Sequence, residues 1–306
     1  MTLSPARLLM TEADNLFRSR SYADAQKLYE KAASAAQAAP TDTATLIEAL
    51  SQVARSHLIQ DRPDEGAVWL ERAAELASSE EPAGWSRYIG VKGRFEWKRG
   101  DNETATATFK DMYAYCLEYE LHDRAVDAAH MVAITAGPEQ QIEWGKKGIA
   151  AAEEGGIESW LGPLWNNLGW TYSDMGEHDQ ALAALQKARE YHWQTATNEQ
   201  AKLVADWSIA HAWFKVGDIK NALIWLRPTL AWAERRYAEK ANADTAEWVG
   251  HSHKLLADIA EAQEKPGEAL TELKLALQYL KKAKMPKWDA DGYKELEVRA
   301  QNLQSQ

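Results

Sequence analysis

The sequence has 306 residues, of which 45% are hydrophobic, and a formal net charge of −11 at pH 7. That apolar content is ample for a packed core and too high for a disordered chain. The acidic balance argues against general binding to nucleic acid, because the chain as a whole repels phosphate backbones. Alanine is abundant, β-branched residues are few, and proline and glycine lie mostly between helical patterns. We therefore expect an all-α protein.

The only cysteine is Cys116, so no disulfide can form within the chain, which fits a reducing compartment. Its neighbours Tyr113 and Leu117 predict a small buried side chain. Glu118 and Glu120 argue against a reactive thiolate, which needs a cationic neighbour.

The first residues, MTLSPARLLMTEADNLF, lack the apolar core and the cleavage site of a signal peptide. No apolar run in the sequence approaches the ~20 residues needed to cross a bilayer. We therefore expect a cytoplasmic protein that does not bind membranes.

Taken in chain order, the predicted elements are seven pairs of helices and one final helix. The pairs are expected at residues 5–38, 42–78, 84–120, 122–154, 160–194, 200–241 and 245–284, and the final helix at 287–304. We predict that they form a single array over residues 1–306. The polar last helix would cover the open end of the array.

The register of the pairs is clearest at residues 165–189, WNNLGWTYSDMGEHDQALAALQKAR. Gly169 is followed twelve residues later by Ala181 and four residues after that by Leu185. Helices that cross closely need a small residue at the point of nearest approach and bulky residues around it. Six of the seven pairs keep this order; their first small residues are Ala13, Ala54, Gly93, Gly169, Ala210 and Ala257. In pair four the same register falls on His130, Ile142 and Lys146, which do not fit.

Glycine followed by an acidic residue marks the turn in three pairs, at Gly100-Asp101, Gly176-Glu177 and Gly217-Asp218. We expect a positive φ at each glycine and a helix-capping role for the acidic residue. Pro63, Pro138 and Pro266 fit first helical turns, and Pro228 is a candidate kink within a long helix.

These repeated pairs resemble the tetratricopeptide repeat, in which each unit is two antiparallel helices. The resemblance runs from about Ala13 to Leu280, with anchors 37 to 47 residues apart rather than at the minimal spacing. It implies a right-handed superhelix whose first helices line a concave groove. It also implies a non-catalytic scaffold or adaptor that binds a protein or peptide in that groove.

Helical offsets from the small residues place a set of side chains on the groove side of the first helices. The predicted groove residues are Arg55, Arg87, Arg94, Trp97, Lys98, Asn166, Trp170, Trp207, His211 and Phe214. Arginine forks bind carboxylates and aromatic rings bind apolar segments, so these residues predict an acidic peptide with apolar anchors. The alternative is that the arginines pair with neighbouring acids and the tryptophans are packing. The family's carboxylate clamp is incomplete here, since only Asn167 matches it, and loosely.

Tryptophans on the predicted second helices are expected to pack between units, because large aromatic residues dominate buried contact area. They are Trp69, Trp144, Trp225 and Trp232. Trp160 and Trp165 are expected at the junction of pair five with the irregular pair four.

The sequence gives little support to an enzyme. His251 and His253 are two residues apart, so on a helix they lie ~200° apart and cannot share a metal ion. Asp127 and His130 can share a face, but no second carboxylate-histidine helix accompanies them. No phosphate loop or nucleophile motif is present. We therefore predict no catalysis, no metal and no cofactor.

Two other hypotheses stay open. The array could be structural and self-associate into a homo-oligomer, or it could carry a metal-dependent site in pair four. The basic segment KKAKMPK at residues 281–287 is expected to be a solvated connection and not a nucleic-acid patch.

Overall fold

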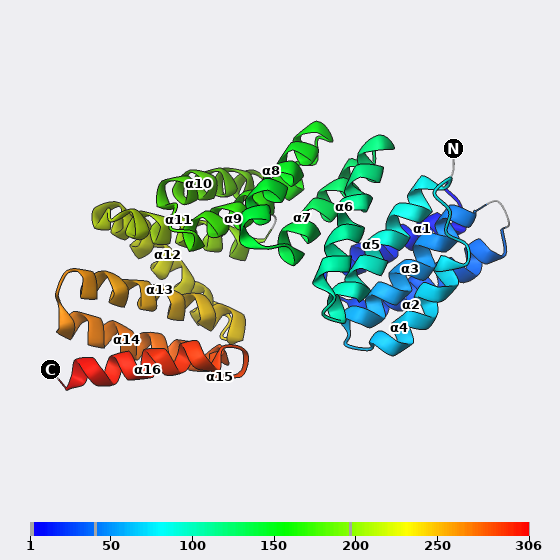
Figure 1. Cartoon of the computed structure of the whole chain (residues 1–306). Helices are drawn as coiled ribbons and strands as arrows, with labels where there is room; N and C mark the ends of the chain where they lie inside the picture. Colours follow the sequence, from blue (N-terminus) through cyan, green and yellow to red (C-terminus); the bar gives the residue numbers. More distant parts are fainter. Residues whose placement is uncertain (1–2, 40–41, 196–197, 306) are drawn as a thin grey trace. The chain divides into compact units, whose positions relative to one another are not determined.

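The structure is a computed structural model that describes residues 3–39, 42–195 and 198–305. The extreme ends of the predicted 1–306 array, and the linker residues 40–41 and 196–197, lie outside the described residues. Every regular element within the described ranges is a helix, which confirms the all-α prediction (Figure 1).

The helices follow one another as consecutive hairpins (Figure 1). Their bounds are α1 (Pro5–Arg18), α2 (Tyr22–Gln37), α3 (Thr43–Ile59), α4 (Pro63–Ala74), α5 (Pro82–Lys98), α6 (Asn102–Glu118), α7 (His122–Thr135), α8 (Pro138–Glu154), α9 (Glu158–Asp174), α10 (His178–Thr195), α11 (Glu199–Val216), α12 (Ile219–Glu239), α13 (Ala243–Ala262), α14 (Pro266–Lys282), α15 (Met285–Trp288) and α16 (Ala290–Gln304). Each predicted pair corresponds to two successive helices, and α12 continues as a helix through Pro228.

The chain forms two compact units, Met1–Trp160 and Leu161–Gln306, which we call unit 1 and unit 2 and describe separately. In unit 1 each helix packs against the next from α1 to α4 and from α5 to α8, while α3 also packs against α5. In unit 2 the same succession links α10 to α14, and α16 packs against α14.

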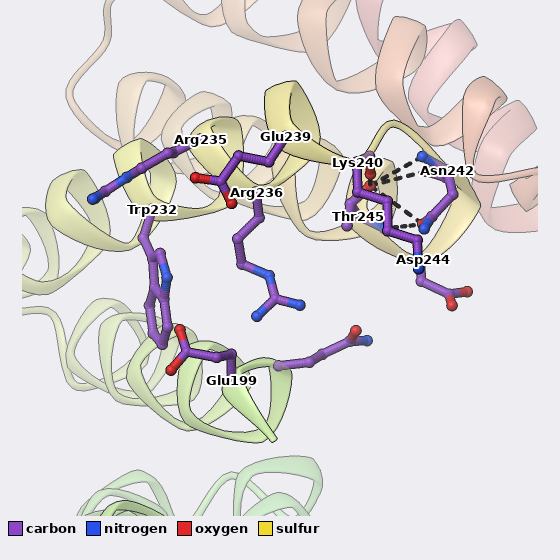
Figure 2. Close-up of a pocket in the computed structure, with 10 residues that line it drawn as sticks. Glu199, Trp232, Arg235, Arg236, Glu239, Lys240, Asn242, Asp244 and Thr245 are labelled. Atoms are coloured by element: carbon purple, nitrogen blue, oxygen red, sulfur yellow. Dashed lines mark hydrogen bonds between the residues drawn. The ribbon is translucent and has the colours of Figure 1, made fainter. Parts of the chain in front are cut away.

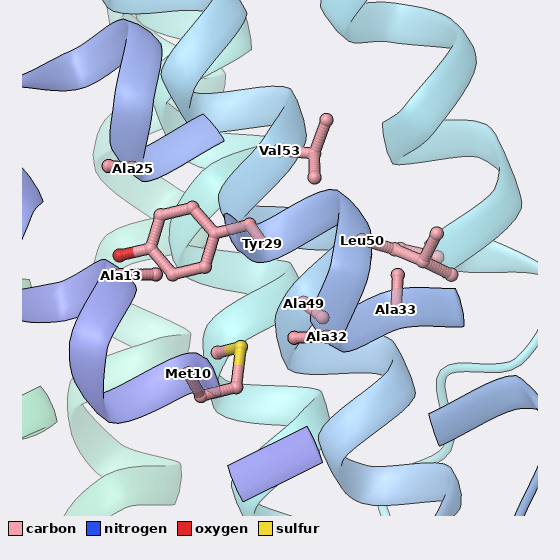
Figure 3. Close-up of a cluster of buried hydrophobic side chains, with 10 residues drawn as sticks. Met10, Ala13, Ala25, Tyr29, Ala32, Ala33, Ala49, Leu50 and Val53 are labelled. Carbon is pink, nitrogen blue, oxygen red and sulfur yellow. The ribbon is translucent and has the colours of Figure 1, made fainter. Parts of the chain in front are cut away.

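The first core of unit 1 shows why small residues set the register (Figure 3). Ala13 of α1 and Ala25 of α2 are fully buried, and Tyr29 fills the space that they leave. The Tyr29 hydroxyl donates to Asp14 Oδ1 at 2.6 Å, so its polar end is satisfied inside the core. Burial, reinforced by the Asp14 charge, raises the pKa of Tyr29 well above its usual range.

Glycine at a crossing is required by the facing side chain. A Cβ atom on Gly169 would lie 2.6 Å from Leu185 Cγ, and one on Gly93 would lie 2.8 Å from the ring of Phe109. Real Cβ contacts are longer than this, so only glycine fits without a shift. Both pairs match the predicted register, in which the bulky residue comes four positions after the second small one.

Pair four departs from the repeated register, as its sequence indicated. Ile142 is only half-buried and Lys146 is exposed, while the buried small residues of α7 and α8 include Ala129 and Gly145. The two helices are joined by the short extended link Ala136–Gly137. No single pair of small residues defines this crossing, because Ala125, Ala128 and Gly148 are buried as well.

The capping predictions are confirmed where the structure describes them. Gly100, Gly176 and Gly217 have φ of +83°, +77° and +90°. The Asp101 and Asp218 side chains each accept a hydrogen bond from the backbone three residues further on. Non-glycine residues Arg20, Asp61 and Glu264 occupy the same left-handed turn in pairs one, two and seven, with φ near +60°.

Replacing Glu264 by glycine is expected to stabilise the protein by up to about 1 kcal/mol, because a left-handed conformation costs L-residues about that much. Glu264 has φ +57° and an exposed side chain. The reverse change, Gly217→Glu, is expected to destabilise it. Urea denaturation of both variants measures the effect. Equal stability of Glu264→Gly and the parent would show that this turn is relaxed as it stands.

Tryptophans on second helices pack between pairs, as predicted. Trp144 of α8 meets the ring of Tyr113 of α6 edge-on, with centroids 5.1 Å apart. Trp225 and Trp232 of α12 lie against apolar clusters of unit 2. Trp160 contacts pair four, where its ring lies 5.9 Å from that of His130.

The C-terminal end of unit 2 is closed by α16. Leu296 and Ala300 of α16 are buried against Leu273 and Leu280 of α14, which confirms the capping helix. The basic segment at 281–287 is not a simple solvated connection, because Met285 is buried in this same cluster. Ala283 of the segment is buried too, and residues Met285–Trp288 form the short helix α15.

None of the helices in the described ranges combines the length and the apolar character that crossing a bilayer requires. Cys116 is fully buried, as predicted, and this burial raises the pKa of its thiol to about 12.

Candidate functional site

Five arginines gather on the first helices of unit 1, and we call this surface the arginine face. They are Arg7 on α1, Arg55 on α3, Arg87 and Arg94 on α5, and Arg124 on α7. The helices that carry them are neighbours, since α3 packs against α1 and α5, and α5 against α7. The face therefore concentrates positive charge within an acidic chain.

Glu48 of α3 holds two of these arginines together. Arg7 Nη2 lies 2.6 Å from one Glu48 oxygen, and Arg124 Nη2 donates to the other. Arg124 also donates to the hydroxyl of Ser86 at 2.6 Å. The Glu48 side chain is only 4% exposed, so this triad links three first helices through a buried carboxylate.

Arg94 is likewise neutralised within the fold. It donates to Asp127 Oδ1 at 2.6 Å and to the carbonyl of Gly90 at 2.9 Å. Both side chains are largely buried. The alternative that the arginines pair with acids of the chain is therefore correct for Arg94, a predicted groove residue.

These ion pairs predict loss of stability in acid. Burial alone would raise the pKa of Glu48, but Arg124, Arg87 and Arg7 outweigh it and lower that pKa. Asp127 is shifted in the same direction by Arg94, Arg55 and Arg87 against its burial. A lowered folded-state pKa contributes stability above the unfolded-state value, and this is lost as pH falls through the folded-state value.

Urea denaturation at pH 6, 4 and 3 is therefore expected to show unfolding free energy falling below about pH 4. The fall is expected to be shallower in a variant that lacks the Glu48 carboxylate. Parallel curves for the two proteins would show that Glu48 does not contribute to the acid response.

Arg55 and Arg87 differ from the other three because no carboxylate of the described residues pairs with them. The Nε atoms of both are buried and have no hydrogen-bond partner within the described ranges. Arg55 lies over the ring of Phe17, with Cζ 4.9 Å from its centroid. Burial, with Arg94 and Arg87 nearby, lowers the pKa of Arg55 to about 9, so it is still protonated at neutral pH.

Two other predicted groove residues of unit 1 lie at the end of α5, away from this cluster of charges. Trp97 is 43% exposed. The Lys98 ammonium lies 2.9 Å from Asp61 in an exposed ion pair, which contributes little to stability or binding.

Unit 2 carries a contiguous set of rings on its first helices, which we call the aromatic face. It consists of Trp170 on α9, Trp207 and His211 on α11, and Trp248 and His251 on α13. Trp207 lies at its centre, with centroids 6.1 Å from Trp170, 5.6 Å from Trp248 and 5.4 Å from His211. Trp170, Trp207 and His211 were predicted to share one surface, and their rings are in contact in the structure.

Both histidines of the aromatic face are uncharged at neutral pH. Burial lowers the pKa of each to about 4, reinforced by Lys215 and Lys254 at His211 and by Lys254 at His251. The Nε1 of Trp207 and the Nδ1 of His211 are buried without a hydrogen-bond partner among the residues described. The face is thus an apolar, uncharged surface with two unsatisfied ring nitrogens.

The aromatic face includes two residues that the sequence analysis missed, Trp248 and His251. They lie nine and six residues before Ala257, the small residue of α13. Continuing the helical offsets from Ala257 toward the N-terminus would have found them. Phe214 is half-buried and packs, like Trp207, against the core cluster around Ala210. Asn166 lies half-buried one turn before Trp170.

The two histidines of α13 point to different surroundings, as the helical rotation predicted. His251 lies 5.5 Å from the Trp248 ring, while His253 Nδ1 lies 2.6 Å from Glu272 Oε2 of α14. Asp127 is held by Arg94, and the His130 ring contacts Trp160. Among the described residues, no group of three or more histidine, cysteine or acidic side chains is arranged to hold a metal ion.

A pocket of about 530 Å³ lies where the C-terminal end of α12 meets the starts of α11 and α13 (Figure 2). The Arg236 side chain extends into it between Trp232 and Glu199 (Figure 2). Its charged lining is balanced: Arg235, Arg236 and Lys240 against Glu199, Glu239 and Asp244. The pocket contains none of the predicted site residues and offers no net charge to a ligand.

Seven consecutive helix pairs with small residues at their crossings define a tandem helical-repeat protein. The family model described as tetratricopeptide repeat matches residues 162–190, which cover the turn and the crossing of Gly169 with Leu185. The chain therefore carries a tetratricopeptide repeat at residues 162–190, within a succession of helix pairs. No curated protein matches the sequence.

Solved structures with low sequence identity share the fold. A signal transduction ATPase with numerous domains and a tetratricopeptide-repeat sensor, from Pyrococcus horikoshii, has a TM-score of 0.72 at 13% identity. The match covers 95% of this chain but only 44% of that one. The apo form of RapI has a TM-score of 0.71 at 11% identity, over 96% of this chain and 85% of that one. BtubC from P. vanneervenii has 0.57 at 14%, over 78% and 94%.

Proposed function

We propose that this protein is a non-catalytic scaffold or adaptor that binds a protein partner through an extended peptide segment. The segment would lie along the first helices, as ligands of this repeat family commonly do. The observation that supports this best is the aromatic face, where three successive helix pairs each contribute tryptophan or histidine to one surface.

The tryptophans of the aromatic face pack against core clusters of unit 2 on one side and are partly exposed on the other. Leu203 and Ile209 of α11 are buried almost completely and supply the core contacts of that helix. Trp170, Trp207 and Trp248 keep part of their surface exposed. Partly exposed tryptophans grouped on one surface are typical of binding hot spots, since they offer large rigid area at low entropic cost.

The chemistry of the two faces suggests the partner. The aromatic face fits apolar anchors, and the arginine face fits acidic side chains. We propose a protein partner with apolar anchors for the aromatic face and acidic side chains for the arginine face, each face taken by itself, in a cytoplasmic setting, with no metal, cofactor, nucleic acid or membrane involved. Self-association into a homo-oligomer is the alternative use of the same surfaces.

A peptide array of acidic segments with leucine or tryptophan anchors tests the proposal. Trp207→Ala is expected to weaken binding at least ~10-fold, because truncating a central aromatic residue removes most hot-spot energy. Trp193→Ala is the matched control, since Trp193 is 43% exposed on the second helix α10. Equal binding by parent and Trp207→Ala would overturn the proposal. A dimer in light scattering that Trp207→Ala dissociates would favour self-association.

A further inference from the structure

We propose that Arg55 and Arg87 form a binding site for carboxylate groups on the arginine face, and that acidic side chains of an extended protein segment occupy it. The inference deepens the proposed function, on which it rests for the identity of the ligand as a peptide. It assigns a specific chemistry to two residues of unit 1.

The arginine face carries an excess of positive charge. Five guanidinium groups stand against three carboxylates, those of Asp14, Glu48 and Asp127. Five positive charges less three negative charges leave two positive charges, in a chain whose net charge is −11. The surplus equals the number of arginines that lack a counter-ion. Two carboxylates from a ligand would neutralise the face.

Two of the five arginines have no ion-pair partner among the described residues. Arg7 and Arg124 share Glu48, and Arg94 has Asp127. Arg55 and Arg87 have no ion pair with any residue that the structure describes, although each buries its Nε without a partner. Desolvating a charge without neutralising it is unfavourable, and such groups in native proteins usually mark an absent ion or ligand.

The Arg55 guanidinium is held in position before a ligand binds. The Arg55 guanidinium is supported by the Phe17 ring on one side. The pair of Arg94 and Asp127 fixes the neighbouring charges at a separation of 2.6 Å. A ligand therefore does not have to order the Arg55 side chain, which would otherwise weaken binding.

The chemistry of the surroundings favours carboxylate over phosphate. Both anions already bound to arginines of this face are carboxylates, those of Glu48 and Asp127. A guanidinium fork matches a planar carboxylate with two parallel hydrogen bonds. All five cations of the face are arginine side chains of α1, α3, α5 and α7. Phosphate groups are commonly bound by the backbone N–H groups of a helix N-terminus, and none of the contacts described above uses one.

The test compares the full-length parent with Arg55→Gln and Arg87→Gln in low-salt buffer. The control is Arg99→Gln, because Arg99 is an exposed arginine at the end of α5. The probes are glutarate, inorganic phosphate, and a capped hexapeptide of alternating glutamate and leucine with its glutamine counterpart. Thermal unfolding reports stabilisation by each probe, and calorimetry reports peptide affinity.

Glutarate is expected to raise the unfolding midpoint of the parent and of Arg99→Gln by a few degrees, and to leave both site variants unchanged. The glutamate peptide is expected to bind the parent at least ~10-fold more tightly than it binds either site variant. The parent is expected to bind the glutamine peptide at least ~10-fold more weakly than the glutamate peptide. Without any probe, Arg55→Gln is expected to unfold at a higher temperature than the parent, because an unneutralised buried charge has been removed.

Equal responses of the parent and the two site variants would overturn the carboxylate site. A larger effect of phosphate than of glutarate would overturn the choice of carboxylate. Stabilisation by glutarate that needs both arginines, with no peptide binding at all, would support the site and count against the proposed function. Peptide binding that depends on Trp207 but on neither arginine would support the function and overturn the site.

Discussion

Replacing Glu48 by leucine is expected to lower the free energy of unfolding by about 3–5 kcal/mol, because it leaves two buried guanidinium groups without their shared counter-ion. Arg7 and Arg124 approach this carboxylate from different helices, and its side chain is only 4% exposed. Leucine has a similar volume, so the loss reports the charge and not a cavity.

Urea denaturation followed by tryptophan fluorescence measures this effect. Glu143→Leu is the matched control, because Glu143 forms an exposed ion pair with Lys147 one helical turn away and is expected to be silent. The double variant Glu48→Leu, Arg124→Met should lose less stability than the two single changes added together, since removing both charges leaves one fewer unpaired. A loss below about 1 kcal/mol for Glu48→Leu would show that water, and not Glu48, neutralises the arginines.

Gly169→Leu is expected to destabilise the protein by about 3 kcal/mol, the upper end for overpacking a core. The new Cβ alone would lie 2.6 Å and 2.8 Å from side-chain carbons of Leu185, and 3.2 Å from its backbone nitrogen. The side chain can adjust, but the backbone contact requires α9 and α10 to move apart. Loss of the close crossing then exposes apolar surface between them.

Gly267→Leu provides the matched control for the helix crossing. Gly267 lies in the first turn of α14, and a Cβ atom there would meet nothing within 4 Å. This change is expected to leave the denaturation midpoint unchanged, and Leu185→Ala should partly rescue Gly169→Leu by reopening space. Equal stability of the two glycine variants would contradict the assigned register.

Much of the fold follows from local patterns in the sequence. Gly169 and Leu185 are sixteen residues apart, and the contact between them is fixed by the length of one turn and by helical periodicity. The left-handed turns at Gly100 and Gly217 follow from glycine's freedom at positive φ. Pair four escaped this reasoning because its sequence does not keep the order of small and bulky residues, and only the packed helices show which of its small residues are buried.

The candidate sites were predictable only as surfaces. Helical offsets placed Arg55, Arg87 and Arg94 on first helices, and Trp170 with Trp207 on another stretch of first helices. They could not show that Arg94 forms an ion pair with Asp127, 33 residues away, whereas the buried Arg55 Nε has no hydrogen-bond partner among the described residues. They also could not show which rings touch one another, as Trp207 touches Trp170 and Trp248.

By itself the sequence determined the helices, their pairing and the small residues at their crossings, because these depend on contacts between neighbours along the chain. The tertiary structure decided which charges are satisfied. Glu48 meets Arg124 across 76 positions of the sequence, and such a pairing depends on how successive layers stack, which no local spacing encodes. A charged side chain takes its role from the partner that packing brings within about 4 Å, and that partner is set by the fold as a whole.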